Sequence, residues 1–397
     1  MMQRVRSLVG SDAVVESHAD GLPLVLPSTT EACALVLEAA SREGWRVRIE
    51  GARTWADHPA PADLALGTTS LSSVASVHAT DLVATVEAGI RLSRLREALA
   101  DQGGWLAADP PGADRTLGSA IATGTSGPLR SGFGALRDHL LGVTIVTGDG
   151  RILKPGGKVV KNVAGFDLTR LAAGSFGAFG VITSVHLRLR TVPRADVTLL
   201  ATGARDDLVD AATAILAAGE SPAALELLSP AASGRDAWTL AARLVGSEMA
   251  VEHSRRTLTS AAARPFNDVP GAEAFPFWQS LGERAVRRPV TLRLGTLIGG
   301  LADTLDLIAH HLDDEWTTTS AGAAAIRWSG TATAERIRLL RHAAMQRETP
   351  VTVERAPWDV LSATGHFGAF REGVGPLLAS LRRVFDPKGV LVVPEGA

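Results

Sequence analysis

The sequence predicts an α+β fold, on the evidence of two patterns along the chain. Strand-type and helix-type segments alternate twice before Pro193, and they alternate again in two strand–helix–strand units after it. Residues 151–193 are dense in glycine, with Gly174, Gly177 and Gly180 at every third position. Such glycines indicate close backbone approach to another element or to a ligand, and a tight helix-to-strand crossover is an equal alternative from spacing alone.

The first unit begins with a short apolar strand at 22–27. Ser28 is the expected N-cap of a helix over 29–42, because Glu31 stands three residues later, as in a capping box. A second strand, WRVRIE, leads into a loop of small residues at 51–54. Backbone N–H groups in such a loop can bind an anion, although an ordinary turn is the commoner interpretation.

The second unit has a strand at 82–90 and a helix at 92–104, and it leads to the turn Pro110-Pro111-Gly112. Residues 116–127 are almost all Gly, Ala, Ser and Thr, a composition too small for a normal core helix. The run suits a large flat or extended ligand lying against the main chain, and a close-packed helix in a crowded layer is the alternative. A hairpin over 140–154 follows, with Asp149-Gly150 in its turn.

Composition and missing motifs exclude several classes of function. The 397 residues have a formal net charge of −2, which gives no reason to expect a nucleic-acid partner. Cys33, the single cysteine, rules out an internal disulfide and is expected to be a buried apolar residue. There is no Rossmann or P-loop motif and no metal-ligand spacing, so we predict no metal site. No signal peptide or membrane-spanning run is found, which predicts a cytoplasmic protein without direct membrane insertion.

The order of the motifs resembles a known family. VATVEAGI, DPPGADRTLGSAIATG, GFGALRDHLLGVTIVTGDGRI and KNVAGFDLTRLAAGSFGAFGVIT follow one another as in the FAD-binding domain of the vanillyl-alcohol-oxidase and p-cresol-methylhydroxylase (PCMH-type) superfamily. Within it, the pattern is most similar to the FAD-binding (E) subunits of glycolate oxidase. The resemblance covers about residues 20–193, with a short echo at 385–391.

The resemblance implies a domain plan. A PCMH-type FAD-binding domain would occupy 1–193, with subdomains at about 20–78 and 79–193. A ferredoxin-like α+β cap domain would follow at 194–355, as its two strand–helix–strand units also suggest. Residues 356–397 would return to the FAD-binding domain.

The resemblance also implies where FAD binds. The expected residues for the pyrophosphate are Gly51, Ala52, Arg53 and Thr54; those for the flavin and ribityl chain are Pro110, Pro111, Gly112, Thr116, Gly118, Ser119, Thr123 and Gly124; those near the adenosine are Gly177, Gly180, Val181 and Ile182; and Asp138, Asn162, Gly165 and Asp167 complete the set. The first loop is poorer in glycine than is usual in the family, so Arg53 is expected to pair with phosphate. No histidine occupies that loop, and His58 lies beyond it, so we expect non-covalent FAD.

Catalytic residues are harder to assign. Relatives that oxidise D-2-hydroxy acids have a metal-binding His-x-x-Gly-Asp-Gly-Asn motif, and this chain has none. His366 is the nearest candidate, although a core or surface histidine is the commoner interpretation. Lys161, beside Asn162, is a second candidate, because an ammonium near the flavin would stabilise its anionic reduced form.

The resemblance implies a subunit of a glycolate (D-2-hydroxy acid) oxidase or dehydrogenase complex. Hydride would pass to FAD, and electrons would leave to an iron–sulfur subunit. A second flavin subunit would be a further partner. Through these partners the protein would associate peripherally with the inner membrane or remain in the cytoplasm. Two alternatives are a stand-alone FAD-dependent alcohol or lactone oxidase that uses oxygen, and a degenerate scaffold subunit without enzymatic activity.

Overall fold

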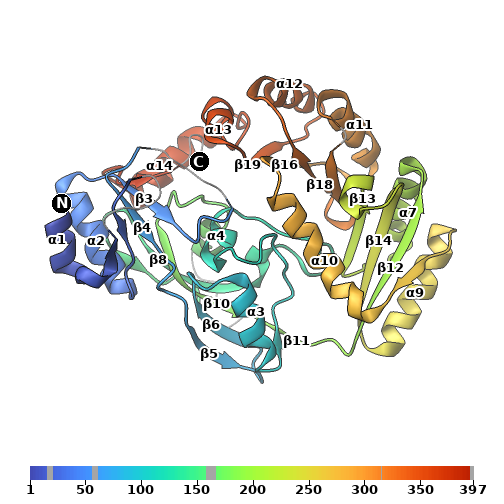
Figure 1. Cartoon of the computed structure of the whole chain (residues 1–397), viewed down its shortest axis with the longest axis horizontal. Helices are drawn as coiled ribbons and strands as arrows, with labels where there is room; N and C mark the ends of the chain where they lie inside the picture. The colour runs from blue at the N-terminus through green and yellow to red at the C-terminus, as the bar shows by residue number, and fades with distance from the viewer. Residues whose placement is uncertain (16–20, 56–60, 158–166, 314, 394–397) are drawn as a thin grey trace.

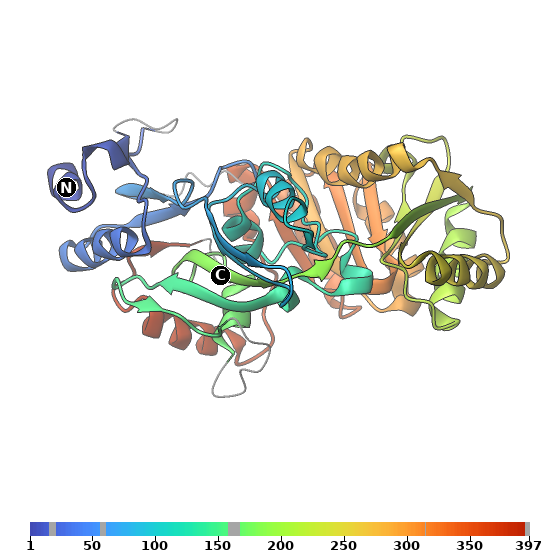
Figure 2. The same ribbon diagram turned by 90° about the horizontal axis from the view of Figure 1, so that it is seen from below.

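A computed structural model describes residues 1–15, 21–55, 61–157, 167–313 and 315–393. Three large β-sheets and a two-stranded pair organise these residues, and Figures 1 and 2 show the large sheets along an elongated molecule. Two five-stranded sheets lie at one end, and an eight-stranded sheet lies at the other. The α+β prediction is therefore confirmed.

The first sheet is mainly parallel. Its strands, in spatial order, are β1 (Val14–Val15), β2 (Leu24–Val25), β4 (Leu64–Gly67), β3 (Val47–Glu50) and β20 (Leu391–Val392). Helices α1 (Met2–Val9) and α2 (Thr30–Glu43) pack beside it. Cys33 on α2 is fully buried in this core, as predicted.

The cap of α2 differs from the prediction by one residue. Thr29, not Ser28, is the N-cap, and its hydroxyl accepts a hydrogen bond from the Ala32 N–H at 3.0 Å. The helix therefore starts at Thr30, and Glu31 falls in its first turn, where a carboxylate interacts favourably with the helix dipole.

The second sheet is antiparallel and carries the predicted hairpin. Its strands, in spatial order, are β5 (Val74–His78), β6 (Val83–Glu87), β10 (Val181–Arg188), β8 (Leu140–Val146) and β9 (Ile152–Leu153). Its helices are α3 (Leu92–Ala100), α4 (Leu117–Ala122), α5 (Arg130–Phe133) and α6 (Leu168–Ala172). The short pair β7 (Gly104–Trp105) and β11 (Arg190–Thr191) lies next to the point where the chain leaves for the third sheet.

The third sheet consists of two ferredoxin-like units. Its strands, in spatial order, are β15 (Asn267–Val269), β12 (Ala195–Gly203), β14 (Trp238–Gly246), β13 (Ala224–Leu228), β17 (Trp316–Ser320), β18 (Ala325–Gly330), β16 (Val290–Gly295) and β19 (Val351–Arg355). Each unit has the order 4-1-3-2, and the second strands of the two units, β13 and β17, pair antiparallel at the centre. The sequence did not predict β17 or this continuous sheet.

The two faces of the third sheet are covered differently. One face packs on α7 (Arg205–Ala217), α9 (Glu248–Ala262), α11 (Leu301–His311) and α12 (Ala334–Met345). The other face packs on α8 (Pro230–Ser233) and α10 (Gly271–Val286), through Trp278 and Leu281 of α10. The sequence analysis missed helix α10. Figure 1 shows it between this face of the third sheet and the second sheet.

The C-terminal part of the chain reaches the first sheet again. After α13 (Trp358–Thr364) and α14 (Val374–Phe385), β20 pairs parallel with β3. Asp386, only 3% exposed, fixes this last turn: its carboxylate accepts hydrogen bonds from the N–H groups of Val390 and Leu391, each at 2.8 Å.

Replacing this carboxylate should loosen the first sheet. We expect Asp386→Ala to lower the free energy of unfolding by roughly 2–4 kcal/mol, because two buried N–H groups lose their acceptor. Urea unfolding followed by tryptophan fluorescence measures the loss, and hydrogen exchange at β3 locates it. Glu372→Ala, at an exposed position before α14, is the control; an equal effect of the two changes would contradict the assigned role of Asp386.

Candidate functional site

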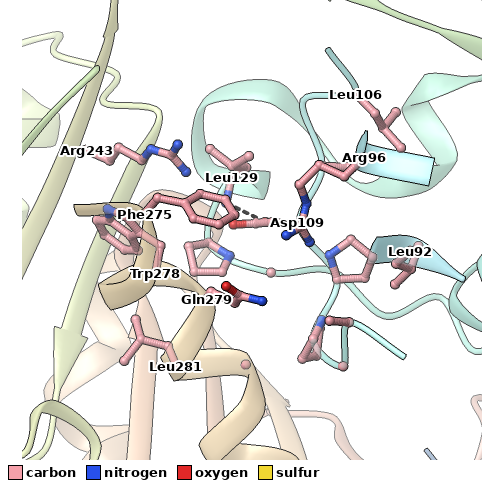
Figure 3. A pocket seen from close by; sticks show the side chains of 18 of the residues that line it. Leu92, Arg96, Leu106, Asp109, Leu129, Arg243, Phe275, Trp278, Gln279 and Leu281 are labelled. Carbon is pink, nitrogen blue, oxygen red and sulfur yellow. Dashed lines mark hydrogen bonds between the residues drawn. The ribbon is translucent and has the colours of Figure 1, made fainter. Parts of the chain in front are cut away.

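Two cavities lie on either side of the segment 109–123. The inter-sheet cavity, of about 320 Å³, lies between the first and second sheets. The interdomain cavity, of about 400 Å³, lies between α3 and the face of the third sheet that carries α10 (Figure 3). Volumes of this size are typical of sites for small molecules and cofactors.

Many of the residues expected to bind a dinucleotide gather around the inter-sheet cavity. Those that line it are Gly51, Ala52, Arg53, Thr54, Thr116, Gly118, Ser119, Thr123, Gly177, Gly180 and Ile182. They come from the loop after β3, from α4 and its cap, and from the turn that leads into β10. Distant segments of the chain thus form one wall.

The loop 51–54 forms a tight turn against α4. A Cβ on Gly51 would lie 2.4 Å from the Thr116 hydroxyl oxygen, so glycine is required where the loop meets the cap of α4. Arg53 adopts a left-handed conformation, with φ of 54°. This conformation favours glycine, so the glycine-poor loop keeps its shape at a cost in backbone strain.

The small-residue run proves to be both a helix and a cavity wall. Thr116 caps α4 by accepting a hydrogen bond from the Ser119 N–H at 3.2 Å. One side of the helix is buried in the core through Leu117 and Ile121. Ser119 and Thr123 lie on the cavity side, so the two alternatives drawn from the sequence are compatible.

Arg115, which the sequence analysis missed, stands between the two cavities. It is 1% exposed, and its guanidinium donates to Thr123 Oγ1 at 2.7 Å, to the Ser119 carbonyl at 3.2 Å and to the Pro111 carbonyl at 3.4 Å. The same group lies 4.0 Å from the centre of the Trp55 ring. It thereby joins a wall of the inter-sheet cavity to the segment that lines the interdomain cavity.

The charge of Arg115 is poorly compensated. Among the described residues it forms no ion pair, and its Nε–H has no hydrogen-bond acceptor. Burial lowers the pKa of this guanidinium to about 9. A buried cation without a partner anion is costly, and an anionic ligand in the adjoining cavity would relieve that cost.

These features fit FAD. Small residues allow a ligand to approach the backbone, and Arg115 lies behind two residues of the cavity wall, Ser119 and Thr123, where its charge favours a pyrophosphate. Pro110, Pro111 and Gly112 line the interdomain cavity instead, so the expected flavin segment and the expected pyrophosphate loop border different cavities with Arg115 between them.

Other expected residues lie outside both cavities. Asp138 accepts a hydrogen bond from the Ala135 N–H at 2.9 Å, and Asp167 caps α6. Val181 is buried in the core behind the first sheet, and Gly124 packs beside Gly174. Their observed contacts hold secondary structure in place.

The two candidate catalytic residues differ in what can be said of them. His366 is fully buried; its Nδ1 lies 2.6 Å from the Val353 carbonyl oxygen, and its ring packs on Phe176. It lines neither cavity, which agrees with the interpretation of a core histidine. Lys161, Asn162 and Gly165 lie outside the described residues.

Two buried carboxyl groups line the interdomain cavity. Burial raises the pKa of Asp109 to about 7. The Leu129 N–H, which donates to its Oδ1 at 3.0 Å, acts in the opposite direction and lowers the pKa. Burial also raises the pKa of Glu226 to about 8, with a further contribution from the charge of Asp109, although the Ser320 hydroxyl donates to Glu226. Asp109 belongs to the segment before α4 and Glu226 to β13, so the two domains each supply one acid.

The described residues include no metal-binding cluster and no membrane-spanning helix. They bring together no group of three or more His, Cys, Asp or Glu side chains suited to a metal ion. None of their helices combines the length and the apolar character needed to cross a bilayer.

Comparison with known proteins identifies the N-terminal part. Residues 22–156 match the family described as FAD binding domain. Over 122 residues the chain is 43% identical to the glycolate oxidase subunit GlcE of Escherichia coli, a match to 30% of this chain and 35% of that protein. It is 35% identical over 160 residues to a mitochondrial D-lactate dehydrogenase (cytochrome) of Arabidopsis thaliana, covering 40% of this chain and 28% of that protein.

The full-length similarity is one of fold. The chain spans about a third of the length of the first curated relatives that it matches. An alkyldihydroxyacetonephosphate synthase structure aligns with a TM-score of 0.70, covering 93% of this chain and 75% of the other, at 15% identity. The third sheet and the C-terminal return therefore have a structural counterpart beyond the matched sequence.

Glu226 should make stability depend on pH. A carboxyl group whose pKa is raised on folding favours the native state at low pH, and this contribution is lost as pH rises from about 4.5 toward about 8. We expect Glu226→Gln to match the wild type below about pH 5 and to exceed its stability near pH 8. Thermal unfolding across this range checks the result, with exposed Glu248→Gln as the control; parallel curves would refute it.

Arg115 should contribute to FAD affinity. We expect Arg115→Met to weaken FAD and ADP binding about 10-fold, because the positive charge behind the cavity wall at Ser119 and Thr123 is lost, and to change riboflavin binding less. Isothermal titration calorimetry measures all three. Arg341→Met is the control, since the half-buried Arg341 also donates to backbone carbonyls, but those of Thr364 and His366, which line neither cavity. Equal losses for the two variants would argue against a phosphate contact.

Proposed function

We propose, from the PCMH-type FAD-binding domain that residues 22–156 form, that this chain is a flavin-dependent oxidoreductase acting on the CH–OH group of a 2-hydroxy acid. Curated relatives of the matched region are named glycolate oxidase subunits and D-lactate dehydrogenases, which supports this class of donor. When bound, FAD would supply the two-electron acceptor, and the protein would supply binding, orientation and proton transfer.

One observation supports the proposal above the others: the segment 109–123 borders both cavities. Ser119 and Thr123 face the inter-sheet cavity, and Asp109 and Pro110 face the interdomain cavity. A cofactor held along this segment would have its phosphates on one side and open space for a second molecule on the other. That arrangement suits a two-substrate redox site better than a scaffold.

The chain's own groups would have three tasks. The loop 51–54 would hold the cofactor phosphates without a covalent bond, and the charge of Arg115 behind the cavity wall would favour them. The walls of the interdomain cavity would exclude water from the reacting carbon. A carboxylate in that cavity would take the hydroxyl proton, since no histidine among the described residues lines either cavity.

The partners follow from the same relatives. Proteins named as glycolate oxidase subunits suggest that this chain also works in a complex. With Cys33 as its single cysteine, and that residue fully buried, the chain cannot ligate an iron–sulfur cluster itself. We therefore propose a separate iron–sulfur subunit as electron acceptor and a second flavin subunit, with the assembly in the cytoplasm or peripheral to the inner membrane.

The absorption spectrum of the purified chain tests the proposal. We expect bound flavin that acid precipitation releases into the supernatant, and bleaching of the flavin band on anaerobic addition of a 2-hydroxy acid. Bleaching that requires an added partner would make the chain an electron relay. Peroxide formation by the isolated chain would favour the stand-alone oxidase. A protein that FAD cannot reconstitute would reject both enzymes and leave the scaffold.

A further inference from the structure

The interdomain cavity has apolar walls from both domains (Figure 3). Helix α3 and the segment after Gly127 supply aliphatic side chains, and α10 and β17 supply aromatic ones. The principal apolar lining residues are Leu92, Leu95, Leu129, Phe275, Trp278 and Trp316. A wall of this composition favours a ligand with an apolar part of its own.

Three arginines line the cavity, and two of them are already paired. Arg243 binds Asp196 through two nitrogens, at 2.5 and 2.9 Å. Arg327 binds Glu354 in the same two-pronged way, at 2.8 and 3.2 Å. Arg96 forms no ion pair with any described residue; its guanidinium lies over the Phe275 ring at 5.4 Å. Arg96 is therefore the arginine of this cavity that is available to bind an anionic ligand.

Each acid that lines the cavity accepts at least one hydrogen bond. Asp196 is held by Arg243, Glu283 accepts the Ala113 N–H at 2.8 Å, and Glu226 accepts the Ser320 hydroxyl. Asp109 accepts one hydrogen bond, from the Leu129 N–H to its Oδ1, which leaves Oδ2 for a ligand, and it is the acid that lies beside Arg96 in Figure 3.

The backbone fixes Asp109 in this position. A Cβ on Gly127 would lie 1.9 Å from the Asp109 carbonyl oxygen and 2.6 Å from its Oδ1. The close approach of Gly127 leaves the carboxyl group little room to turn away. Figure 3 shows Asp109 between Arg96 and Arg243, at the centre of the cavity lining.

We propose that the interdomain cavity selects 2-hydroxy acids with an apolar side chain, with Arg96 binding the carboxylate and Asp109 accepting the hydroxyl proton. The inference rests on the proposed function and names its substrate class. The side chain of the acid packs on the apolar wall at Phe275 and Trp278, and glycolate has no side chain to bury there.

The chemical step balances with groups already named. The hydroxyl proton passes to Asp109 Oδ2, the α-hydrogen leaves with two electrons as hydride to bound FAD, and the C–O single bond becomes the carbonyl of a 2-oxo acid. Asp109 must be ionised to act. Facing charged groups are Arg96 of α3, Arg243 of β14, Glu226 of β13 and Arg327 of β18.

Binding is measured first, without turnover, on the FAD-loaded chain. Hexanoate, which has no hydroxyl group to oxidise, should quench the fluorescence of the cavity tryptophans and bind at least tenfold more tightly than acetate. Arg96→Met should weaken hexanoate at least tenfold and leave hexan-1-ol unchanged. Arg94→Met is the matched control, since Arg94 lies on the same helix and pairs with Glu97 at 2.9 Å on the exposed side. Equal affinity for acetate and hexanoate, or equal effects of the two variants, would overturn the inference.

Flavin reduction by stopped flow follows. The second-order rate constant should rise severalfold for each methylene from glycolate to 2-hydroxyhexanoate, as expected for burial of apolar surface. Asp109→Asn should lower the reduction rate at least 100-fold and abolish its rise across pH 7, while hexanoate affinity stays within threefold of the wild type. An unchanged pH profile in this variant would show that Asp109 is not the proton acceptor.

The outcomes distinguish a failure of the proposed function from a failure of the proposed substrate class. A wild-type flavin that no 2-hydroxy acid reduces, in a protein that binds FAD, would reject the proposed function together with the role of Asp109. Reduction by glycolate as fast as by 2-hydroxyhexanoate would keep the function and reject the substrate class.

Discussion

The buried guanidinium of Arg115 is the contact on which the organisation of the site depends. It holds the turn at Pro111, the helix residues Ser119 and Thr123, and the Trp55 ring in one arrangement. These groups belong to the first loop, to the cap of α4 and to the segment facing the third sheet. Much of the site thus meets at one buried cation that forms no ion pair with a described residue, although the charge of Glu354 favours it from beyond ion-pair distance.

The arrangement of helices on the third sheet accounts for the interdomain cavity. Two ferredoxin-like units join through β13 and β17, and the helices α7, α9, α11 and α12 all pack on one face of the combined sheet. The opposite face is left to the short helix α8 and to α10, the connection between the units. Glu226 and Trp316 stand on the two central strands, so the junction of the units supplies the floor of the interdomain cavity.

Local patterns predicted much of this structure because they reflect local physics. Alternating apolar residues gave β6, β10 and most cap strands, and Gly44 marked the end of α2. The prediction of Ser28 as the cap was wrong by one residue, because two hydroxyl residues precede the helix and the sequence does not say which of them turns inward. Helix α10 was missed because Gly271, Pro276 and Gly282 weaken its propensity, whereas burial of Trp278 and Leu281 stabilises it.

Some site residues were predicted from the sequence and others were not. Resemblance of motifs led to the loop 51–54 and to α4, which do border a cavity. Arg115 and Asp109 stand inside the quoted motif DPPGADRTLGSAIATG, but the motif did not single them out, because each acquires its properties from burial by distant segments. Asp109 stands directly before Pro110, and an acid beside the expected flavin segment was the one clue available in the sequence.

The pairing of β20 with β3 has a consequence for how the protein is made. The first sheet receives a strand that the ribosome synthesises only after the entire cap domain, because Leu391 pairs with Val47. Non-local pairings of this kind form late, and domains otherwise tend to fold in the order of their synthesis. The first sheet therefore begins to form early in synthesis but is complete only when its last strand, Leu391–Val392, has been made.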